Sequence, residues 1–199
     1  MKDVYAYKFG DNLYINLTNR CCNACKFCIR THGDTVNGED NLWLSKEPTS
    51  DEVVEAIKAV DYDYEDVVIC GYGEPTYKME ELIAVADYAH SIGKKVRLNT
   101  NGLGNLINGA DITPLLKGKT DVISISLNES SAEKYDELCL PKYGLDAYPA
   151  ILDFTKKCVN LGIDTVLSVV DYGGVNIDEC RAVAESTGAK LRVREYIPD

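Results

Sequence analysis

Short apolar runs rich in β-branched residues alternate along this chain with segments of helical periodicity, and this alternation constrains the fold most. Six runs have the length and composition of strands: residues 13–18, 66–70, 95–99, 121–127, 165–170 and 190–195. Between them, apolar residues recur at intervals of three and four, as on one face of a helix. Strands that alternate with helices are typical of a parallel sheet, so we expect an α/β fold.

Capping residues indicate where several helices begin and end. Thr49 followed by Glu52 forms a capping box, and an apolar stripe continues from it. Further helices are expected to begin near Met79, Ser130, Asp146 and Asn176 and to end near Gly93, Gly162 and Gly188. Residues 111–117 give the weakest helical pattern. A helix is therefore expected in each interval between two predicted strands.

The length of the chain limits the number of strand–helix units. Six units account for nearly all of the 199 residues, whereas a closed eight-unit barrel takes about 250. With 45% hydrophobic residues, the chain can bury one sizeable core. We therefore expect a single domain over residues 1–199, built as a partial (βα)6 barrel of parallel strands.

Polar and glycine-rich segments follow the first four predicted strands. The first strand leads to a group of cysteines, the second to GYGEP at residues 71–75, and the third to NTNG at residues 99–102. The fourth ends in the polar segment SISLN at residues 124–128. Because loops converge at the carboxyl ends of parallel strands and carry the chemistry there, we expect a site at this end of the sheet.

Three cysteines on one short loop, Cys21, Cys25 and Cys28, have the spacing Cys-x-x-x-Cys-x-x-Cys. Soft thiolate ligands favour iron–sulfur clusters, and three of them can hold three irons of a [4Fe-4S] cube. The fourth iron would then be open to a ligand that is not protein. Cys22, between two of these ligands in sequence, cannot easily share the cube.

A zinc site and a set of reduced structural thiols are the alternative interpretations of this loop. Structural zinc usually takes four ligands from two separated pairs, and the chain has no second pair. His32 and Cys22 are the nearby residues that could complete a zinc site. The other cysteines stand singly and are expected to pack in the core: Cys70, Cys139, Cys158 and Cys180.

Charge and hydropathy narrow the function classes further. The 21 basic and 32 acidic residues give a net charge of −11, which repels phosphate backbones, so nucleic acid is disfavoured as a partner. The short basic runs at residues 94–97, 117–119 and 156–157 are expected to be solvated. No apolar run reaches the roughly 18 residues that span a bilayer, and residues 1–8 lack the apolar core of a signal peptide. We expect a cytoplasmic protein with reduced cysteines and no membrane contact.

Taken together, these motifs resemble those of the radical S-adenosylmethionine (radical SAM) superfamily over residues 5–197. The cysteine spacing is the strongest likeness, and the segment GEP at residues 73–75 resembles the family's Gly-Gly-Glu-Pro motif, with Tyr72 in place of the first glycine. Residues 12–20, 71–76 and 99–104 are most similar to the short radical SAM proteins encoded beside TatD-type metal-dependent hydrolases. The resemblance implies a link to such a hydrolase as an association, not as a mechanism.

The resemblance implies a [4Fe-4S] cluster on Cys21, Cys25 and Cys28, with S-adenosyl-L-methionine on its open iron. The backbone near Gly73 and Glu74 would accept hydrogen bonds from the ammonium group of S-adenosylmethionine. Five other polar residues would contact the ribose or carboxylate of S-adenosylmethionine: Asn99, Asn101, Ser126, Asn128 and Ser168. Of these, Ser126 and Asn128 are favoured for the ribose. Phe27 would lie against the adenine. The alternatives are that Phe27 packs the loop and that Glu74 and the asparagines only cap turns.

A second set of residues would face the substrate if the strand ends converge: Arg30, His32, Tyr72, Arg194 and Tyr196. An arginine in this set is suited to binding an acidic group. The alternative for each arginine is an ion pair with a surface carboxylate, and for His32 a position in a loop without a catalytic role.

The resemblance implies an enzyme, an oxidoreductase or transferase, that cleaves S-adenosylmethionine reductively. Methionine and a 5′-deoxyadenosyl radical would form, and the radical would abstract hydrogen from an unidentified small-molecule substrate. A flavodoxin or ferredoxin is the expected electron donor. Two alternatives stay open: an activating enzyme that makes a glycyl radical on a partner protein, and a zinc or iron–sulfur binding module that is not an enzyme.

Overall fold

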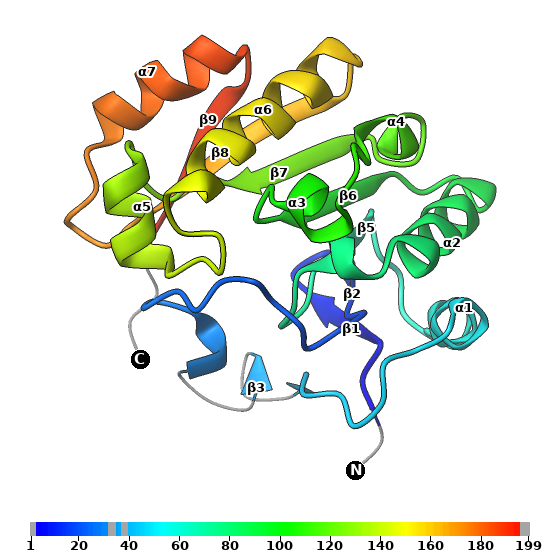
Figure 1. Ribbon diagram of the computed structural model, residues 1–199. Helices are drawn as coiled ribbons and strands as arrows, with labels where there is room; N and C mark the ends of the chain where they lie inside the picture. The colour runs from blue at the N-terminus through cyan, green and yellow to red at the C-terminus, as the bar shows by residue number, and fades with distance from the viewer. Residues whose placement is uncertain (1–2, 32–34, 37–39, 196–199) are drawn as a thin grey trace.

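A computed structural model of the protein describes residues 3–31, 35–36 and 40–195, and its centre is a seven-stranded sheet of order β1-β2-β5-β6-β7-β8-β9 (Figure 1). The strands are β1 (Ala6–Phe9), β2 (Asn12–Ile15), β5 (Val67–Ile69), β6 (Val96–Thr100), β7 (Val122–Ser126), β8 (Asp164–Asp171) and β9 (Lys190–Glu195). From β2 to β9 all neighbours are parallel, and β1 is antiparallel to β2 at one edge. A separate pair joins β3 (Thr35–Val36) to β4 (Asp40–Asn41).

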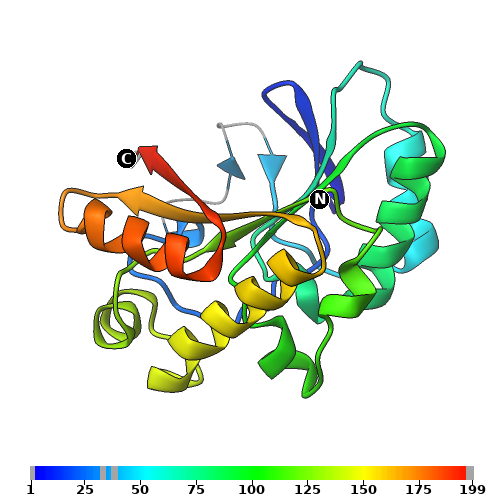
Figure 2. The ribbon, with the colours of Figure 1, turned by 90° about the horizontal axis from the view of Figure 1, so that it is seen from above.

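Helices connect the parallel strands. They are α1 (Ser50–Lys58), α2 (Met79–Ser91), α3 (Gly104–Asn108), α4 (Thr113–Leu116), α5 (Ala132–Cys139), α6 (Ala147–Asn160) and α7 (Ile177–Thr187). Short 3-10 turns lie at η1 (Ile29–Thr31), η2 (Pro75–Tyr77) and η3 (Gly144–Asp146). Seen from above, the crossover helices line one side of the sheet (Figure 2). The architecture confirms the expected α/β partial barrel of parallel strands.

The predicted helix boundaries rest on capping contacts that the structure contains. The Thr49 side chain accepts a hydrogen bond from the backbone N–H of Glu52, whose carboxylate accepts one from the N–H of Thr49, so the capping box is confirmed. The Asn176 side chain accepts a hydrogen bond from the backbone N–H of Glu179 at the start of α7, and Gly188 ends that helix with a left-handed φ of 79°. Residues 111–117, which have the weakest helical pattern, form only the four-residue helix α4, and the short helix α3 precedes it in the same crossover.

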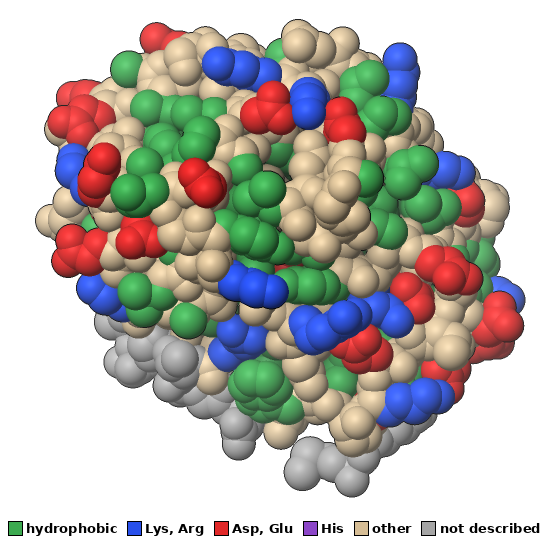
Figure 3. Space-filling view, viewed as in Figure 1, with side chains coloured by type: hydrophobic (Ala, Val, Ile, Leu, Met, Phe, Trp, Pro, Cys, Tyr) green, Lys and Arg blue, Asp and Glu red, His purple; other side chains and the backbone are tan. Residues whose placement is uncertain are grey.

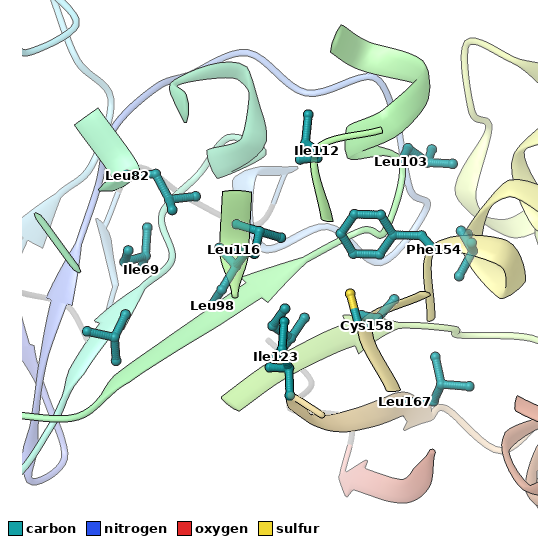
Figure 4. Close-up of a cluster of buried hydrophobic side chains, with 14 of the residues drawn as sticks. Ile69, Leu82, Leu98, Leu103, Ile112, Leu116, Ile123, Phe154, Cys158 and Leu167 are labelled. Carbon is teal, nitrogen blue, oxygen red and sulfur yellow. The ribbon is translucent and has the colours of Figure 1, made fainter. Parts of the chain in front are cut away.

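The two faces of the sheet differ because side chains alternate along each strand. Leu98, Ile123 and Leu167 point toward the helices and join the main core around Phe154 (Figure 4). The residues between them lie on the opposite face, which we call the open face because no crossover helix covers it. Polar residues dominate the open face: Tyr14, Arg97, Asn99, Ser124, Ser126, Ser168, Arg192 and Arg194. The protein thus has an apolar helix-covered layer and a polar open face.

Phe154→Ala should lower the free energy of unfolding by about 3–5 kcal/mol, since it leaves a cavity where a large side chain is fully buried. Urea denaturation followed by circular dichroism measures this change. Leu145→Ala is the control, because Leu145 is 53% exposed and its truncation should change stability by about 0.5 kcal/mol or less. Equal losses in the two variants would contradict the assignment of Phe154 to the core.

Candidate functional site

The loop that carries the three cysteines is held in place by the end of α5. The backbone N–H groups of Ala24 and Lys26 donate to the carbonyls of Cys139 (3.1 Å) and Leu138 (3.0 Å). The Asn23 side chain donates a buried hydrogen bond of 2.8 Å to the Tyr135 hydroxyl. These contacts fix the loop against a helix that lies more than 100 residues away in sequence, so the thiols have a rigid support.

Burial favours the neutral thiol forms of Cys21, Cys22 and Cys25. It raises the pKa of Cys21 to about 11 and that of Cys22 to about 12. The pKa of Cys25 is also raised, first by a hydrogen bond with the Cys139 thiol and then by burial. A bound metal would stabilise the thiolate forms, because its positive charge replaces the missing solvation.

The donor set fits an iron–sulfur cube better than a single zinc ion. Within residues 3–31, 35–36 and 40–195, no three Cys, His, Asp or Glu side chains are grouped as a single metal ion requires. A cube does not need such convergence, since each thiolate binds a different iron. His32, the imidazole that could complete a zinc site, lies outside the described residues. Cys21, Cys25 and Cys28 are the residues that could hold the cube.

Cys22 has a different role from its neighbours on the loop. Its side chain is buried in the main core and accepts a hydrogen bond of 3.2 Å from the Asn101 amide. The side-chain oxygen Oδ1 of Asn101 accepts a hydrogen bond of 2.9 Å from the backbone N–H of Leu103. The Asn101 side chain therefore joins the cysteine loop to the turn after β6. Both polar groups of Asn101 are therefore used in holding loops together, as the turn-capping interpretation predicts.

Glu74 binds protein groups instead of pointing into open space. Its carboxylate is 3% exposed and accepts four hydrogen bonds, from the N–H and hydroxyl of Thr76, the hydroxyl of Thr100 and the N–H of Asn101, at 2.7–3.1 Å. Burial raises the pKa of Glu74, and the four donors oppose that shift. The side chain thus joins the loop after β5 to the loop after β6, and leaves the backbone near Gly73 as the edge that could accept hydrogen bonds.

Glu74→Ala should lower the free energy of unfolding by roughly 2–4 kcal/mol, because four buried donors lose their acceptor. Thermal or urea denaturation measures the loss. Glu185→Ala, which removes an exposed carboxylate from α7, is the control and should leave stability within about 0.5 kcal/mol of wild type. A Glu74→Ala protein as stable as this control would show that the four contacts contribute nothing.

Gly73 lies directly against the chain that follows β2. A Cβ atom at this position would be 2.3 Å from the carbonyl oxygen of Thr18 and 2.6 Å from that of Arg20. The N–H of Glu74 donates to the same Arg20 carbonyl at 2.7 Å. Only glycine permits this approach of two backbones, and the approach keeps the GEP segment beside the start of the cysteine loop.

Three asparagines among the described residues have buried side-chain oxygens that accept no hydrogen bond: Asn16 after β2, and two that the sequence predicts to contact the cofactor. The latter two are Asn99 at the carboxyl end of β6 and Asn128 just beyond β7. Asn128 has a φ of 61°, a conformation that asparagine tolerates well, and its amide donates to the Cys139 sulfur at 3.5 Å. Since buried polar atoms are nearly always paired, these two oxygens are suited to accept hydrogen bonds from a ligand such as a ribose.

The other predicted cofactor residues lie at the same end of the sheet. Ser126 and Ser168 are paired in register on β7 and β8, and the Ser168 hydroxyl donates to the Ile125 carbonyl at 3.4 Å. Phe27 is half-buried and packs against the main core, as expected if it stabilises the loop. The structure therefore brings the cysteine loop, Gly73, Asn128 and Ser168 to the carboxyl ends of neighbouring strands.

The residues expected to face a substrate lie in different parts of the structure. Tyr72 is 4% exposed, packs with Tyr7 and Leu42, and has its ring 5.2 Å from that of Trp43. The Arg30 guanidinium lies 5.8 Å from the centre of the Trp43 ring and donates to the Asn19 carbonyl at 3.0 Å. Arg194 is on the open face. His32 and Tyr196 lie outside the described residues.

Sequence reasoning missed two residues of the site. Cys139 was expected only to pack in the core, and it does, at 0% exposure. It also contacts Cys25 and Asn128, so it forms part of the loop's surroundings. Tyr135 was not considered, although it anchors Asn23. Tyr135 and Cys139 are four positions apart on α5 and therefore lie on one helical face. This spacing was the signal in the sequence that both could contact the same loop.

Fold and site define a class of protein, an α/β partial barrel with a three-thiol loop at the carboxyl ends of its parallel strands. The chain belongs to the radical SAM superfamily, whose family model matches residues 15–186. It is therefore a radical SAM superfamily enzyme, and the family implies a [4Fe-4S] cluster and S-adenosylmethionine as its cofactors.

Curated relatives and solved structures agree with this assignment. A GTP 3′,8-cyclase from Corynebacterium glutamicum is 30% identical over 204 residues, covering 96% of this chain and 50% of the relative. Human molybdenum cofactor biosynthesis protein 1 is 26% identical over 192 residues, covering 94% of this chain and 28% of the relative. The chain thus spans half the length, or less, of these relatives.

Two solved structures share the fold. Streptococcus suis SuiB bound to its precursor peptide SuiA superposes with a TM-score of 0.69 at 17% identity, over 92% of this chain and 39% of that one. The protein anSMEcpe with bound AdoMet gives a TM-score of 0.64 at 14% identity, over 92% of this chain and 50% of that one. At such identities the likeness shows the fold alone.

Proposed function

We propose that this enzyme cleaves S-adenosylmethionine reductively and that the resulting 5′-deoxyadenosyl radical abstracts hydrogen from a small-molecule substrate. The observation that carries the proposal is the three-thiol loop, fixed against α5 and placed beside the Gly73 edge at the carboxyl ends of the strands. When bound, the cluster and S-adenosylmethionine together supply a 5′-deoxyadenosyl radical after one-electron reduction. The protein's own residues bind, orient and exclude water.

Each group of residues has a role in this proposal. Cys21, Cys25 and Cys28 hold the cluster. The backbone at Gly73 accepts hydrogen bonds from the ammonium group of S-adenosylmethionine, and Glu74 holds that backbone in position. The ribose hydroxyls would donate to the unpaired side-chain oxygens of Asn99 and Asn128. Ser126 and Ser168, which are paired in register, lie at the same end of the sheet. Phe27 lies against the adenine, and Asn101 positions the cysteine loop.

The wider context is part of the proposal as well. We assign the activity to a single domain over residues 1–199 in the cytoplasm, with a flavodoxin or ferredoxin as electron donor and a functional link to a TatD-type hydrolase. None of the helices in the described residues is long and apolar enough to cross a membrane. Lys and Arg side chains are interleaved with Asp and Glu on the face in Figure 3, which argues against nucleic acid as a substrate.

The substrate class can be tested by hydrogen transfer. Reconstituted protein, dithionite and S-adenosylmethionine are incubated with a deuterated cell extract separated by filtration into small molecules and proteins, and 5′-deoxyadenosine is analysed by mass spectrometry. We expect deuterium in the product with the small-molecule fraction. GTP is the first pure compound to test, because GTP 3′,8-cyclase is among the relatives. Deuterium only with the protein fraction would select a partner protein, such as a glycyl radical enzyme, and contradict the proposal.

A further inference from the structure

Three arginines lie on the open face of the sheet. Arg97 is on β6, and Arg192 and Arg194 are on the edge strand β9, where they pair in register with Ser168 and Val170 of β8. Side chains of paired residues in neighbouring parallel strands point to the same face, so the guanidinium groups project from the face that the helices do not cover. The open face therefore carries several positive charges in a chain whose net charge is −11.

Arg97 and Arg192 line one space although β6 and β9 are not adjacent in the sheet. Arg97 donates a hydrogen bond of 3.1 Å to the Tyr14 hydroxyl on β2. Burial raises the pKa of Tyr14, and the charges of both Arg97 and Arg192 oppose that shift. The charge of Arg194 acts on the Cys70 thiol after β5. The curved sheet thus turns its edge strands toward each other, as in a partial barrel.

Among the described residues, the lining of this space carries more positive than negative charge, with Asp66 as its carboxylate. Among the described residues, Arg192 and Arg194 form no ion pair, and the Arg97 Nε is buried without a hydrogen-bond partner. Partial desolvation lowers the pKa of Arg194 although its side chain is exposed, and the nearby Arg192 charge lowers it further. Asp164, at the amino end of β8, is 3.3 Å from Lys190. Arg192 and Arg194 are exposed and Arg97 is half-buried, so the donor that lacks a partner away from water is the buried Nε of Arg97, which an anion could satisfy.

The open face also has a hollow of about 130 Å³ next to these groups. Its lining residues are Asp66, Lys95, Val96, Arg97, Val122, Ser124, Val166 and Arg192. The space equals that of roughly four water molecules at about 30 Å³ each, enough for one tetrahedral or planar anion. Its charged lining consists of three cations and one carboxylate, Asp66. The Ser124 hydroxyl and the two guanidinium groups can all donate hydrogen bonds to an anion.

We propose that the substrate carries a phosphate or carboxylate group and that Arg97, Arg192 and Arg194 bind this group on the open face. The identity of the anion as substrate rests on the function proposed above, whereas the anion site itself does not. Planar guanidinium groups bind both oxyanions through paired hydrogen bonds, which explains arginine rather than lysine at these positions. The hollow lies toward the amino ends of β6, β7 and β8, so the substrate would extend from it along the open face to the cysteine loop at the carboxyl ends.

The test is titration calorimetry of the anaerobically reconstituted protein with two probes, pyrophosphate and succinate, at low ionic strength. The double variant Arg192→Gln/Arg194→Gln is compared with wild type and with Arg181→Gln, which removes an exposed arginine on α7. We expect the double variant to bind the preferred probe at least about tenfold more weakly, equal to 1.4 kcal/mol. Arg181→Gln should bind it as wild type does. A preference for pyrophosphate would indicate a phosphorylated substrate, and one for succinate a carboxylic acid.

Two outcomes would overturn the proposal. One is that wild type binds neither probe, or that all variants bind alike. The other is that the double variant loses affinity for S-adenosylmethionine as much as for the probe, which would assign the arginines to the carboxylate of the cofactor. Formation of 5′-deoxyadenosine is measured on the same wild-type sample. Probe binding without this product would refute the proposed radical chemistry and leave the anion site standing, so the two failures are distinguishable.

Discussion

Cys25→Ala is expected to abolish both assembly of the [4Fe-4S] cluster and formation of 5′-deoxyadenosine. Cys25 is the middle one of the three loop thiols, and its removal leaves two thiolates where three irons need a ligand each. Iron and sulfide content and the visible absorbance of the anaerobically reconstituted variant should fall to the level of the protein before reconstitution. Product should fall to the level of a sample without protein.

The matched control is Cys158→Ala. Cys158 is a fully buried thiol in the apolar core near Phe154, visible in Figure 4, and it is not part of the loop. Its truncation should cost roughly 1 kcal/mol of stability and leave the cluster in place. If Cys25→Ala held as much iron and sulfide as Cys158→Ala, the assignment of the loop as the cluster site would be wrong.

Gly73→Ala is expected to destabilise the protein by about 1–3 kcal/mol and to weaken S-adenosylmethionine binding by more than about tenfold. The added methyl group would lie 2.3 Å from the Thr18 carbonyl oxygen, so either the GEP segment or the chain after β2 must move. Both outcomes shift the edge proposed to accept the ammonium group. Equilibrium binding of S-adenosylmethionine to the reconstituted variant, together with urea denaturation, measures the two effects.

Gly174→Ala is a stringent control for that variant. A Cβ at Gly174 would be 2.5 Å from a ring atom of Tyr172, a similarly short distance, but the neighbour is a side chain that can rotate away. Neither position has a positive φ, so only the neighbour differs. Gly174→Ala should therefore bind S-adenosylmethionine as wild type does. A Gly73→Ala variant that behaves like Gly174→Ala would show that the backbone contact at Gly73 does not matter.

The sequence predicts the parallel strands well because each has a strong local signal. Residues 190–195 match β9 without adjustment, and the other five predicted strands overlap β2, β5, β6, β7 and β8. The edge strand β1 (Ala6–Phe9) was not predicted, since four residues with one buried side chain give too short an alternation. The pair β3–β4 has two residues in each strand and offers no periodic pattern at all.

The candidate site is predictable only where its residues are close in sequence. The spacing of the cysteines and the GEP segment are local patterns, and both lie where the carboxyl ends of the strands meet. The support of the loop depends on contacts such as Asn23 to Tyr135, 112 residues apart, which no local pattern reveals. The direction of the Glu74 carboxylate, toward Thr100 and Asn101, likewise depends on packing between two loops.

The surroundings of Arg97 could likewise not be predicted from the local sequence. The basic run at residues 94–97 is expected to be solvated, but Arg97 is half-buried and bonded to Tyr14 on the open face, so that expectation is wrong for this residue. Side chains alternate between the two faces of a strand, so a difference of one residue decides whether a side chain lies in the core or on the open face. Charge counted along the sequence therefore did not identify Arg97 and Arg192 as residues that line one hollow, whereas the position of Arg194 at a strand end did make it a candidate.

Formation of 5′-deoxyadenosine by the wild-type protein is the most direct test of the account. The protein is reconstituted with iron and sulfide without oxygen, reduced with dithionite in the presence of S-adenosylmethionine, and analysed by chromatography. The account predicts 5′-deoxyadenosine and methionine in equal amounts, dependent on both cluster and reductant. Stoichiometric zinc in place of the cluster, or a fully loaded cluster that yields no product under these conditions, would contradict it.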